Sequence, residues 1–147
     1  VKTGVSGGFA VTPNGGDALI DLITALHPKY WAGAIFTMNR YTLGEVRKLK
    51  DSDGNYIWNP DFTTAPSGTI LGMGVDSSFD HLPNIGAGSK SIVFGNLREA
   101  YQIVDRKGMT ILRDPFTNKP FVGFYTTMRV GGDVINSEAY KVLTFEA

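Results

Sequence analysis

The sequence predicts an α+β fold in which two early helices pack on a mostly antiparallel sheet. Apolar residues recur at helical spacing in residues 17–26 and again in residues 42–49. From Ser91 onward they fall in short extended runs separated by turn-forming residues, which is typical of neighbouring strands. This order of helices and then strands favours an α+β domain, because a parallel α/β sheet would alternate the two.

The first helix is predicted to follow an irregular lead-in at residues 1–16, which is rich in glycine and lacks apolar periodicity. Asp17 is the expected N-cap, and Pro28 ends the segment because proline cannot continue a helix. A short buried strand is expected next, at residues 34–38. The apolar face of this helix consists of Leu19, Ile20, Leu22, Ile23 and Leu26.

The second helix is predicted to begin at Thr42, because Thr42 and Glu45 have the spacing of a capping box. In that arrangement each side chain satisfies a backbone N–H group that the first helical turn leaves unpaired. The buried face of this helix is expected to contain Leu43, Val46 and Leu49.

Short strands and turns account for the rest of the predicted fold. Residues 51–55 have the composition of a turn, and residues 56–58 that of a brief extended segment. Residues 76–90 show little periodicity, and a connection of about fifteen residues is long enough to suggest a functional loop. The predicted strands are residues 69–75, 91–94, 101–105, 109–113, 121–130 and 141–145, with turns at residues 106–108 and 114–120.

The composition argues against several classes of function. The 14 basic and 14 acidic residues balance, whereas a domain that binds nucleic acid normally carries a basic excess. Cysteine is absent, which removes disulfides, thiolate catalysis and cysteine-based zinc sites. No apolar run approaches the roughly 20 residues that span a bilayer, and no signal peptide is evident. We therefore expect no cofactor, no specific nucleic-acid partner and no membrane association. The start at Val1 also suggests a piece cut from a longer chain.

Two glycine-containing motifs resemble catalytic or phosphate-binding loops, but their surroundings do not fit. Residues 4–8 have the Gly-x-Ser-x-Gly pattern of a hydrolase nucleophile elbow, yet no helix is expected directly after Ser6. A glycine linker is the favoured interpretation. Residues 86–90 lack the adjacent Gly-Lys pair of a phosphate loop, and a strand rather than a helix is expected after them.

Two acidic segments suggest metal or acid–base chemistry. Residues 51–55 resemble a calcium loop, but Gly54 is the fourth residue of the segment, where an EF-hand has its glycine sixth. Asp76, Asp80 and His81 offer two carboxylates and an imidazole, although a catalytic group also needs convergent geometry. Solvated turn polarity is the favoured interpretation of both segments, and we expect no enzyme.

Three segments, taken in chain order, resemble the major capsid proteins of tailed bacteriophages with the Hong Kong 97 fold. The first comprises residues 17–22 and 30–39, and the second residues 42–58. The third runs from 94 to 145 and contains Phe94-Gly95-Asn96-Leu97 and Arg129-Val130-Gly131-Gly132-Asp133. The resemblance covers the chain from Asp17 to its end.

The resemblance implies an axial domain at residues 17–128 and return strands toward a peripheral domain at residues 129–147. The N-terminal arm, the extended loop and the spine helix of that capsid family have no counterpart in this sequence. It also implies self-association into pentamers and hexamers of a capsid, a virion location after assembly in the bacterial host cytoplasm, and a scaffold or prohead protease as a further partner. The candidate subunit-interface residues are Asp76, Asp80, His81, Asn84, Lys90 and Arg98.

Two alternative functions stay open at this point. An encapsulin-type nanocompartment shell shares the Hong Kong 97 fold but encloses protein cargo, and the neighbouring genes would distinguish it from a virus. A small hydrolase would instead use Ser6 or the Asp80 and His81 pair.

Overall fold

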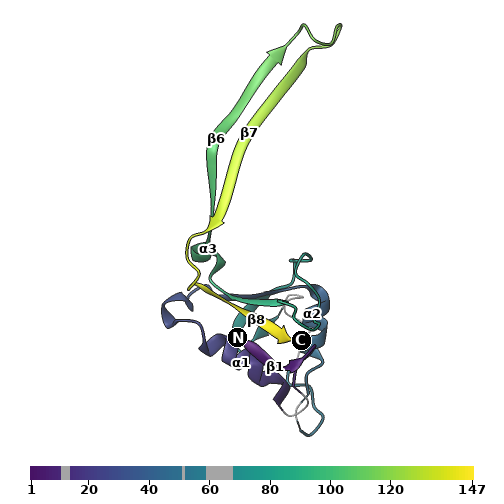
Figure 1. Ribbon diagram of the computed structural model, residues 1–147, viewed down its shortest axis with the longest axis vertical. Helices are drawn as coiled ribbons and strands as arrows, with labels where there is room; N and C mark the ends of the chain where they lie inside the picture. Colours follow the sequence, from purple (N-terminus) through teal and green to yellow (C-terminus); the bar gives the residue numbers. More distant parts are fainter. Residues whose placement is uncertain (11–13, 51, 59–67) are drawn as a thin grey trace. The chain divides into compact units, whose positions relative to one another are not determined.

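The computed structural model describes residues 1–10, 14–50, 52–58 and 68–147. The chain divides into two compact units, of which the first comprises residues 1–100 and 136–147 and the second residues 101–135. The first unit contains a sheet with helices, and the second is a two-stranded antiparallel hairpin (Figure 1). The predicted mixture of helices and strands is therefore confirmed.

The sheet of the first unit has six strands in the order β1-β8-β5-β2-β4-β3. Pairing is antiparallel for β8–β5, β5–β2 and β4–β3, but parallel for β1–β8 and β2–β4. The sheet is thus mixed, with antiparallel pairing only slightly predominant. Its strands are β1 (Lys2–Ser6), β2 (Ile35–Met38), β3 (Thr69–Ile70), β4 (Met73–Asp76), β5 (Ile92–Gly95) and β8 (Tyr140–Glu146).

The predicted irregular lead-in at residues 1–16 is wrong for its first part, because β1 pairs with the C-terminal strand β8. The Val1 ammonium donates to the Val142 carbonyl at 3.0 Å, and the Thr144 N–H donates to the Val1 carbonyl at 2.9 Å. Both ends of the chain therefore lie in the first unit, beside each other (Figure 1). Local sequence could not show this, since the partner strand is more than a hundred residues away.

The first helix, α1, spans Asp17–Thr24 and follows a 3₁₀ turn, η1, at Asn14–Gly16. Its N-cap is Gly16, which makes no side-chain capping bond, so the prediction that Asp17 caps the helix is wrong. Asp17 instead lies in the first turn, where a carboxylate interacts favourably with the helix dipole. Pro28 begins a second 3₁₀ turn, η2, at Pro28–Tyr30, as expected of a residue that stops an α-helix.

The second helix, α2, spans Arg40–Arg47 and starts before the predicted capping box. The cap is Asn39, whose side-chain oxygen accepts the Tyr41 N–H at 2.9 Å. Thr42 lies inside the helix and is buried, and its hydroxyl has no hydrogen-bond partner within the described residues. The predicted buried face is confirmed, with Leu43 and Val46 buried and Leu49 packed against the core.

The predicted strand at residues 69–75 is divided in the structure, and the predicted strands at residues 101–105 and 109–113 are joined. Residues 69–75 form the hairpin β3–β4, in which Leu71 and Gly72 both have positive φ, as a two-residue type I′ turn requires. The predicted turn at residues 106–108 is wrong, because those residues lie within one long strand, β6 (Tyr101–Asp114). Register shifts on both sides of Lys107 take up the irregular composition there.

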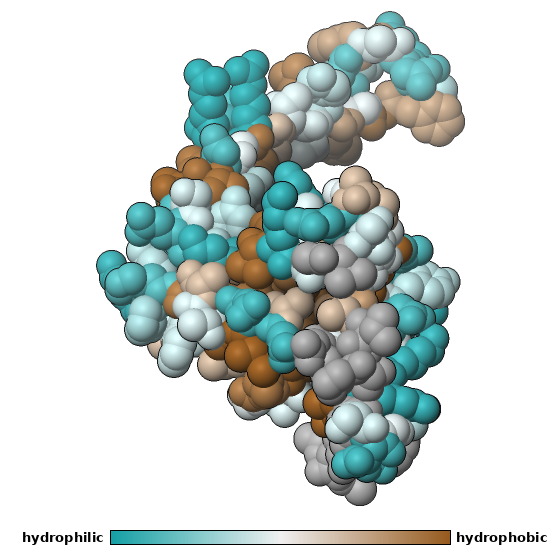
Figure 2. All heavy atoms as spheres, turned by 60° about the horizontal axis from the view of Figure 1, so that its bottom comes forward, coloured by the Kyte–Doolittle hydropathy of each residue, from teal (hydrophilic) through white to brown (hydrophobic). Residues whose placement is uncertain are grey.

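The short helix α3 (Leu97–Ala100) precedes β6, and β6 pairs with β7 (Gly123–Val134) to form the hairpin of the second unit. The predicted turn at residues 114–120 is confirmed, with the Asp114 carboxylate accepting the Phe116 N–H at 2.9 Å. Most large apolar side chains of the hairpin are exposed, and Figure 2 shows hydrophobic residues along its surface. Arg129, the predicted start of the return strands, lies within β7 opposite Lys107.

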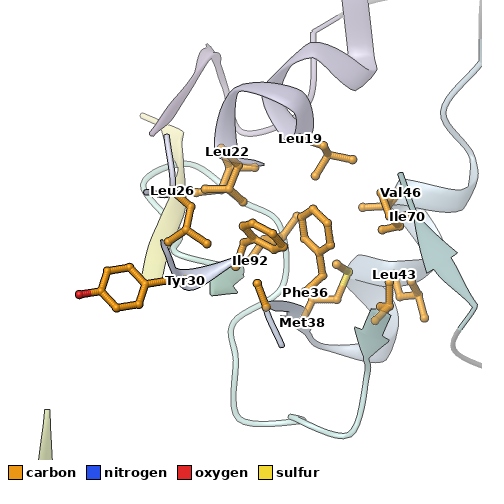
Figure 3. Packing of buried hydrophobic residues seen from close by; sticks show 14 of the residues in the cluster. Leu19, Leu22, Leu26, Tyr30, Phe36, Met38, Leu43, Val46, Ile70 and Ile92 are labelled. Atoms are coloured by element: carbon orange, nitrogen blue, oxygen red, sulfur yellow. The ribbon is translucent and has the colours of Figure 1, made fainter. Parts of the chain in front are cut away.

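The core of the first unit forms where α1 and α2 place leucine and valine side chains against the sheet (Figure 3). Phe36 of β2 and Phe94 of β5 are directly opposite in the register, and their ring centroids lie 4.5 Å apart. Burying such aromatic side chains contributes several kcal/mol, with roughly 25 cal/mol for each Å² of apolar surface removed from water. The fully buried side chains include Leu22, Leu26, Phe36, Met38, Ile92, Phe94, Leu143 and Phe145.

Candidate interface loop

Residues 76–90, here called the interface loop, lie at one end of the six-stranded sheet. Thr37 of β2 is paired with Asp76 of β4, and Met38 is paired with Ile92 of β5. The ends of β2 and β4 and the start of β5 therefore meet at the same end of the sheet. The interface loop connects the end of β4 to the start of β5, so all of it lies at this end of the sheet.

The structure gathers most of the candidate interface residues but separates one of them. Arg98 lies in α3, beyond the opposite end of β5. Since β5 extends by about 3.3 Å per residue, the strand separates Arg98 from Lys90 at its other end. The candidates that share the interface loop are Asp76, Asp80, His81, Asn84 and Lys90.

Asn39 holds the middle of the interface loop. Its side chain is almost fully buried, and its amide nitrogen donates to the carbonyl oxygens of Leu82 at 3.1 Å and Asp80 at 3.4 Å. The same side chain accepts the N–H of Tyr41 and so caps α2. One amide group thus fixes the loop to the start of the second helix.

Two serines hold the C-terminal part of the loop. The Ser89 hydroxyl accepts the Gly86 N–H at 3.1 Å and lies 2.8 Å from the Ser91 hydroxyl. Ser91 is fully buried and donates to the Asn84 carbonyl at 3.0 Å. Because each hydroxyl bonds to another part of the loop, this segment has a defined conformation despite its lack of regular structure.

Backbone hydrogen bonds attach the same segment to β8. The Gly88 N–H donates to the Phe145 carbonyl at 2.9 Å, and the Phe145 N–H donates to the Ser89 carbonyl at the same distance. The loop is therefore fixed at two places, by Asn39 in its middle and by β8 near its end.

The Asp76 carboxylate accepts two hydrogen bonds from Ser78, from the hydroxyl at 2.6 Å and from the N–H at 2.9 Å. These bonds, of which the hydroxyl has the larger effect, lower the pKa of Asp76 below its ordinary 3.8 because they stabilise the ionised form. Asp76 therefore shapes the first turn of the loop and keeps its negative charge.

The side chains that the loop presents to solvent are polar and of both signs. Asp80, His81, Asn84 and Lys90 are exposed, as is Arg98, whereas Asp76 is half-buried. The His81 ring packs edge-on against Phe79, with centroids 6.2 Å apart. A rigid loop with exposed polar side chains is suited to specific contacts with another protein surface. The interface role of these residues stays a prediction.

The geometry does not favour the catalytic alternatives. Ser6 is the last residue of β1, and α1 begins only at Asp17, so the strand-to-helix turn of a nucleophile elbow is missing. Residues 86–90 lead into β5 rather than into a helix. Asp51 of the suggested calcium loop lies outside the described residues. Within the described parts of the chain, no three carboxylates or imidazoles gather where they could hold a metal ion.

A hollow in the first unit is lined mostly by apolar side chains, and none of its described lining residues is titratable. Its described lining comprises Gly16, Leu19, Ile20, Val46, Leu49, Ile57, Trp58, Thr69, Ile70 and Leu71. A catalytic pocket normally adds a few convergent polar groups to such a lining. In addition, no helix in the described residues is long and apolar enough to cross a membrane.

The residues that hold the loop are not among the predicted site residues. Asn39 could have been predicted as the N-cap of the second helix, because asparagine is among the preferred N-cap residues. The capping-box spacing of Thr42 and Glu45 instead led to a predicted helix start at Thr42. Ser89 and Ser91 could not have been predicted in this way. Their partners are set by the path of the loop and not by a local pattern.

The chain is similar to known capsid proteins. The model of the phage capsid family matches residues 1–145. The capsids of the empty and the native GTA particle, each computed with C5 symmetry, match with a TM-score of 0.82 at 41% sequence identity. These matches cover 100% of this chain and 49% of those chains, so the chain spans about half their length.

A structure from Gordonia phage Cozz has the same fold at lower similarity, with a TM-score of 0.51 and 12% identity over 100% of this chain and 49% of that one. A comparison with curated proteins gave no match.

Proposed function

The chain belongs to the phage capsid family, and from this premise we propose that it forms part of a structural subunit that builds a capsid by associating with copies of itself. The match to the GTA capsids over the whole chain carries this proposal. It supports a role through shape and contact surfaces. Among the described residues, no group of three or more carboxylates and imidazoles is placed to hold a metal ion.

The subunit is of the Hong Kong 97 type in this proposal, with the first unit as its axial domain. Residues 1–100 and 136–147 are compact and have their own core, which is what an axial domain requires. The hairpin of residues 101–135 then belongs to the strands that run toward a peripheral domain. This moves the boundary from Arg129 to Tyr101, because a division at Arg129 would cut β7.

Axial domains meet around five-fold and six-fold axes in pentamers and hexamers, through head-to-tail contacts that close into rings. Such contacts need a surface that keeps one conformation in every copy. The interface loop meets this need, because Asn39 and the Ser89–Ser91 pair fix its backbone while its exposed side chains stay available.

The balanced charge fits a wall that encloses nucleic acid without binding it specifically. Assembly takes place in the host cytoplasm with a scaffold or prohead protease as partner, and the product is a virion. An encapsulin-type shell is the alternative, for which a cargo enzyme would be encoded beside the gene. Terminase and portal genes in that position would instead support the virus.

The direct test is electron microscopy of the full-length product of the gene that encodes this chain. Closed shells or rings are the expected result, and a product that stays monomeric at high concentration would refute the proposal. Asp80→Lys tests the interface loop itself, because it reverses an exposed charge without removing a backbone bond.

The matched control is Asp21→Lys, which makes the same charge change at an exposed position of α1. We expect Asp80→Lys to reduce assembly and to leave the melting temperature nearly unchanged, since an isolated surface charge contributes about 1 kcal/mol or less to stability. If both variants assemble like the wild type, Asp80 does not lie in a subunit contact.

A further inference from the structure

The two faces of the β6–β7 hairpin differ in composition. Side chains alternate between the faces along each strand, and residues directly opposite each other lie on the same face. One face, here called the apolar face, is interrupted by only three polar side chains. It consists of Tyr101, Ile103, Asp105, Ile111, Arg113, Phe124, Thr126, Met128, Val130, Gly132 and Val134.

The opposite face carries Lys107 directly across from Arg129. Arg106 and Arg129 also line one hollow on the hairpin, so Arg129 is close to two other cationic residues, Lys107 across the strand pair and Arg106 in the hollow. We call Arg106, Lys107 and Arg129 the basic cluster. Like charges directly opposite each other destabilise a strand pair, so the cluster costs stability unless an anion lies against it.

No carboxylate of the same chain neutralises the basic cluster within the described residues. Ion pairs such as Lys2–Glu146 at 3.6 Å and Lys48–Glu45 at 2.7 Å lie in the first unit and do not involve these three residues. Asp105 is the nearest acidic residue in sequence, but it is paired with Val130 and belongs to the apolar face. All three cations are exposed.

The backbone around the cluster is also irregular. The register shifts between Asp105 and Lys107 and again between Lys107 and Thr110. Bulges of this kind redirect side chains and are often found next to functional sites. Register shifts lie on both sides of Lys107, so the backbone next to the basic cluster departs from a regular strand pair.

We propose that the basic cluster binds carboxylate side chains of a second copy of this chain, at a contact between subunits. The inference rests on the proposed function, which supplies neighbouring copies. Charge complementarity supports this partner, because residues 101–135 contain five basic and three acidic residues. The other residues contain nine basic and eleven acidic ones, so the hairpin of one copy is opposite in net charge to the first unit of the next.

A nucleic acid is a poorer partner for the same face. Asp133 lies on it opposite Gln102, and Leu112 lies on it opposite Tyr125. An acidic side chain and an apolar pair beside so few cations do not form the continuous basic surface that a phosphate backbone requires. They are ordinary components of a protein–protein contact.

The first test is the charge reversal Arg129→Glu in the full-length protein. Within the hairpin this variant replaces a like-charged pair with an opposite-charged one, so it should not weaken the strand pairing. Between copies it should repel the incoming carboxylates. We expect the protein concentration at half assembly, measured by sedimentation velocity, to rise about tenfold or more. Arg129→Lys, which keeps the charge, should assemble at the wild-type concentration.

The control is Lys119→Glu, which makes the same charge reversal in the turn beyond the strands. Arg129→Glu shells that form at the concentration needed for Lys119→Glu would overturn the inference. So would normal assembly of Arg129→Glu with reduced retention of duplex DNA, since the partner would then be a nucleic acid. A wild-type protein that does not associate would refute the proposed function itself, which is a distinct outcome.

A second test uses a carbodiimide, which joins an ammonium and a carboxylate in direct contact. Shells assembled from a mixture of ¹⁴N- and ¹⁵N-labelled chains would show by mass spectrometry whether a cross-link joins two copies. We expect Lys107 to be linked to an aspartate or glutamate of the other isotope. The Lys48–Glu45 pair, at 2.7 Å, is the internal control and should link within one copy. Efficient linking of that control with no mixed-isotope link at Lys107 would overturn the inference.

Discussion

Asn39 is predicted to stabilise both the second helix and the interface loop, and the two contributions can be separated by substitution. Asn39→Ala removes the cap of α2 together with both donations to the loop carbonyls. A lost cap costs about 1 kcal/mol, and a hydrogen bond contributes about 0.5–1.5 kcal/mol. The longer bond to Asp80 belongs at the low end of that range. We therefore expect the free energy of unfolding to fall by about 2–3 kcal/mol.

Asn39→Ser is the matched variant, because serine is an equally good N-cap but has no amide to donate. It should lose only the loop contribution, about 1–2 kcal/mol. Urea denaturation of both variants measures the free energies. Hydrogen exchange measures the loop directly through the amides of Asp80 and Leu82, which are bonded within it. Both amides should exchange faster in either variant.

Two outcomes would refute this reasoning. Equal losses in Asn39→Ala and Asn39→Ser would show that the cap contributes nothing to stability. Unchanged exchange at Asp80 and Leu82 would show that the loop keeps its conformation without Asn39. In that case the serine hydroxyl bonds and the bonds to β8 would be enough to hold the interface loop.

Three further predictions follow from single contacts. Gly95→Ala should destabilise the first unit by about 3 kcal/mol or more, or unfold it, because a Cβ at this position would clash with the backbone of Ala139 and Tyr140. Its control is Gly44→Ala, which adds a methyl group in open space within α2 and should raise the free energy of unfolding, measured in urea, by about 0.5–1 kcal/mol. Thr42→Val should leave the melting temperature unchanged or raise it, since its buried hydroxyl has no partner among the described residues; a clear loss would reveal one. Ser78 lowers the pKa of Asp76, so this carboxylate stabilises the fold above pH 3.8 and the contribution is lost as the pH falls through the lowered pKa. Ser78→Ala should therefore reduce stability near neutral pH but not in strong acid, and an equal loss at both would exclude a role for the ionised carboxylate.

The sequence predicted the elements whose cause is local. Pro28 ended the first helical segment as expected, and β2 and β5 formed near their predicted positions because each is a short run of mostly buried residues. The order of helices and strands likewise gave the α+β class. The location of most interface candidates in one loop was also predictable, since they are neighbours in the chain.

Contacts between residues distant in sequence explain why the predicted turn at residues 106–108 and the predicted helix start at Thr42 were wrong. Arg106, Lys107 and Gly108 have the composition of a turn, but β7 supplies a continuous partner, and the bulges on either side of Lys107 absorb the irregularity. Thr42 has the spacing of a capping residue, yet Asn39 begins the helix because its side chain is also held by carbonyls of the interface loop. In both cases a partner distant in sequence outweighed the local preference.

The amino-acid sequence by itself determined the class of the fold, the positions of most helices and strands, and the resemblance to capsid proteins, because these depend on periodicity and composition along the chain. Tertiary structure decided that β1 joins β8, that residues 101–134 form one hairpin, and that Lys107 lies opposite Arg129. Strand pairing and register depend on which distant segments meet and bury surface together, and residues at a single position in the chain do not encode that choice.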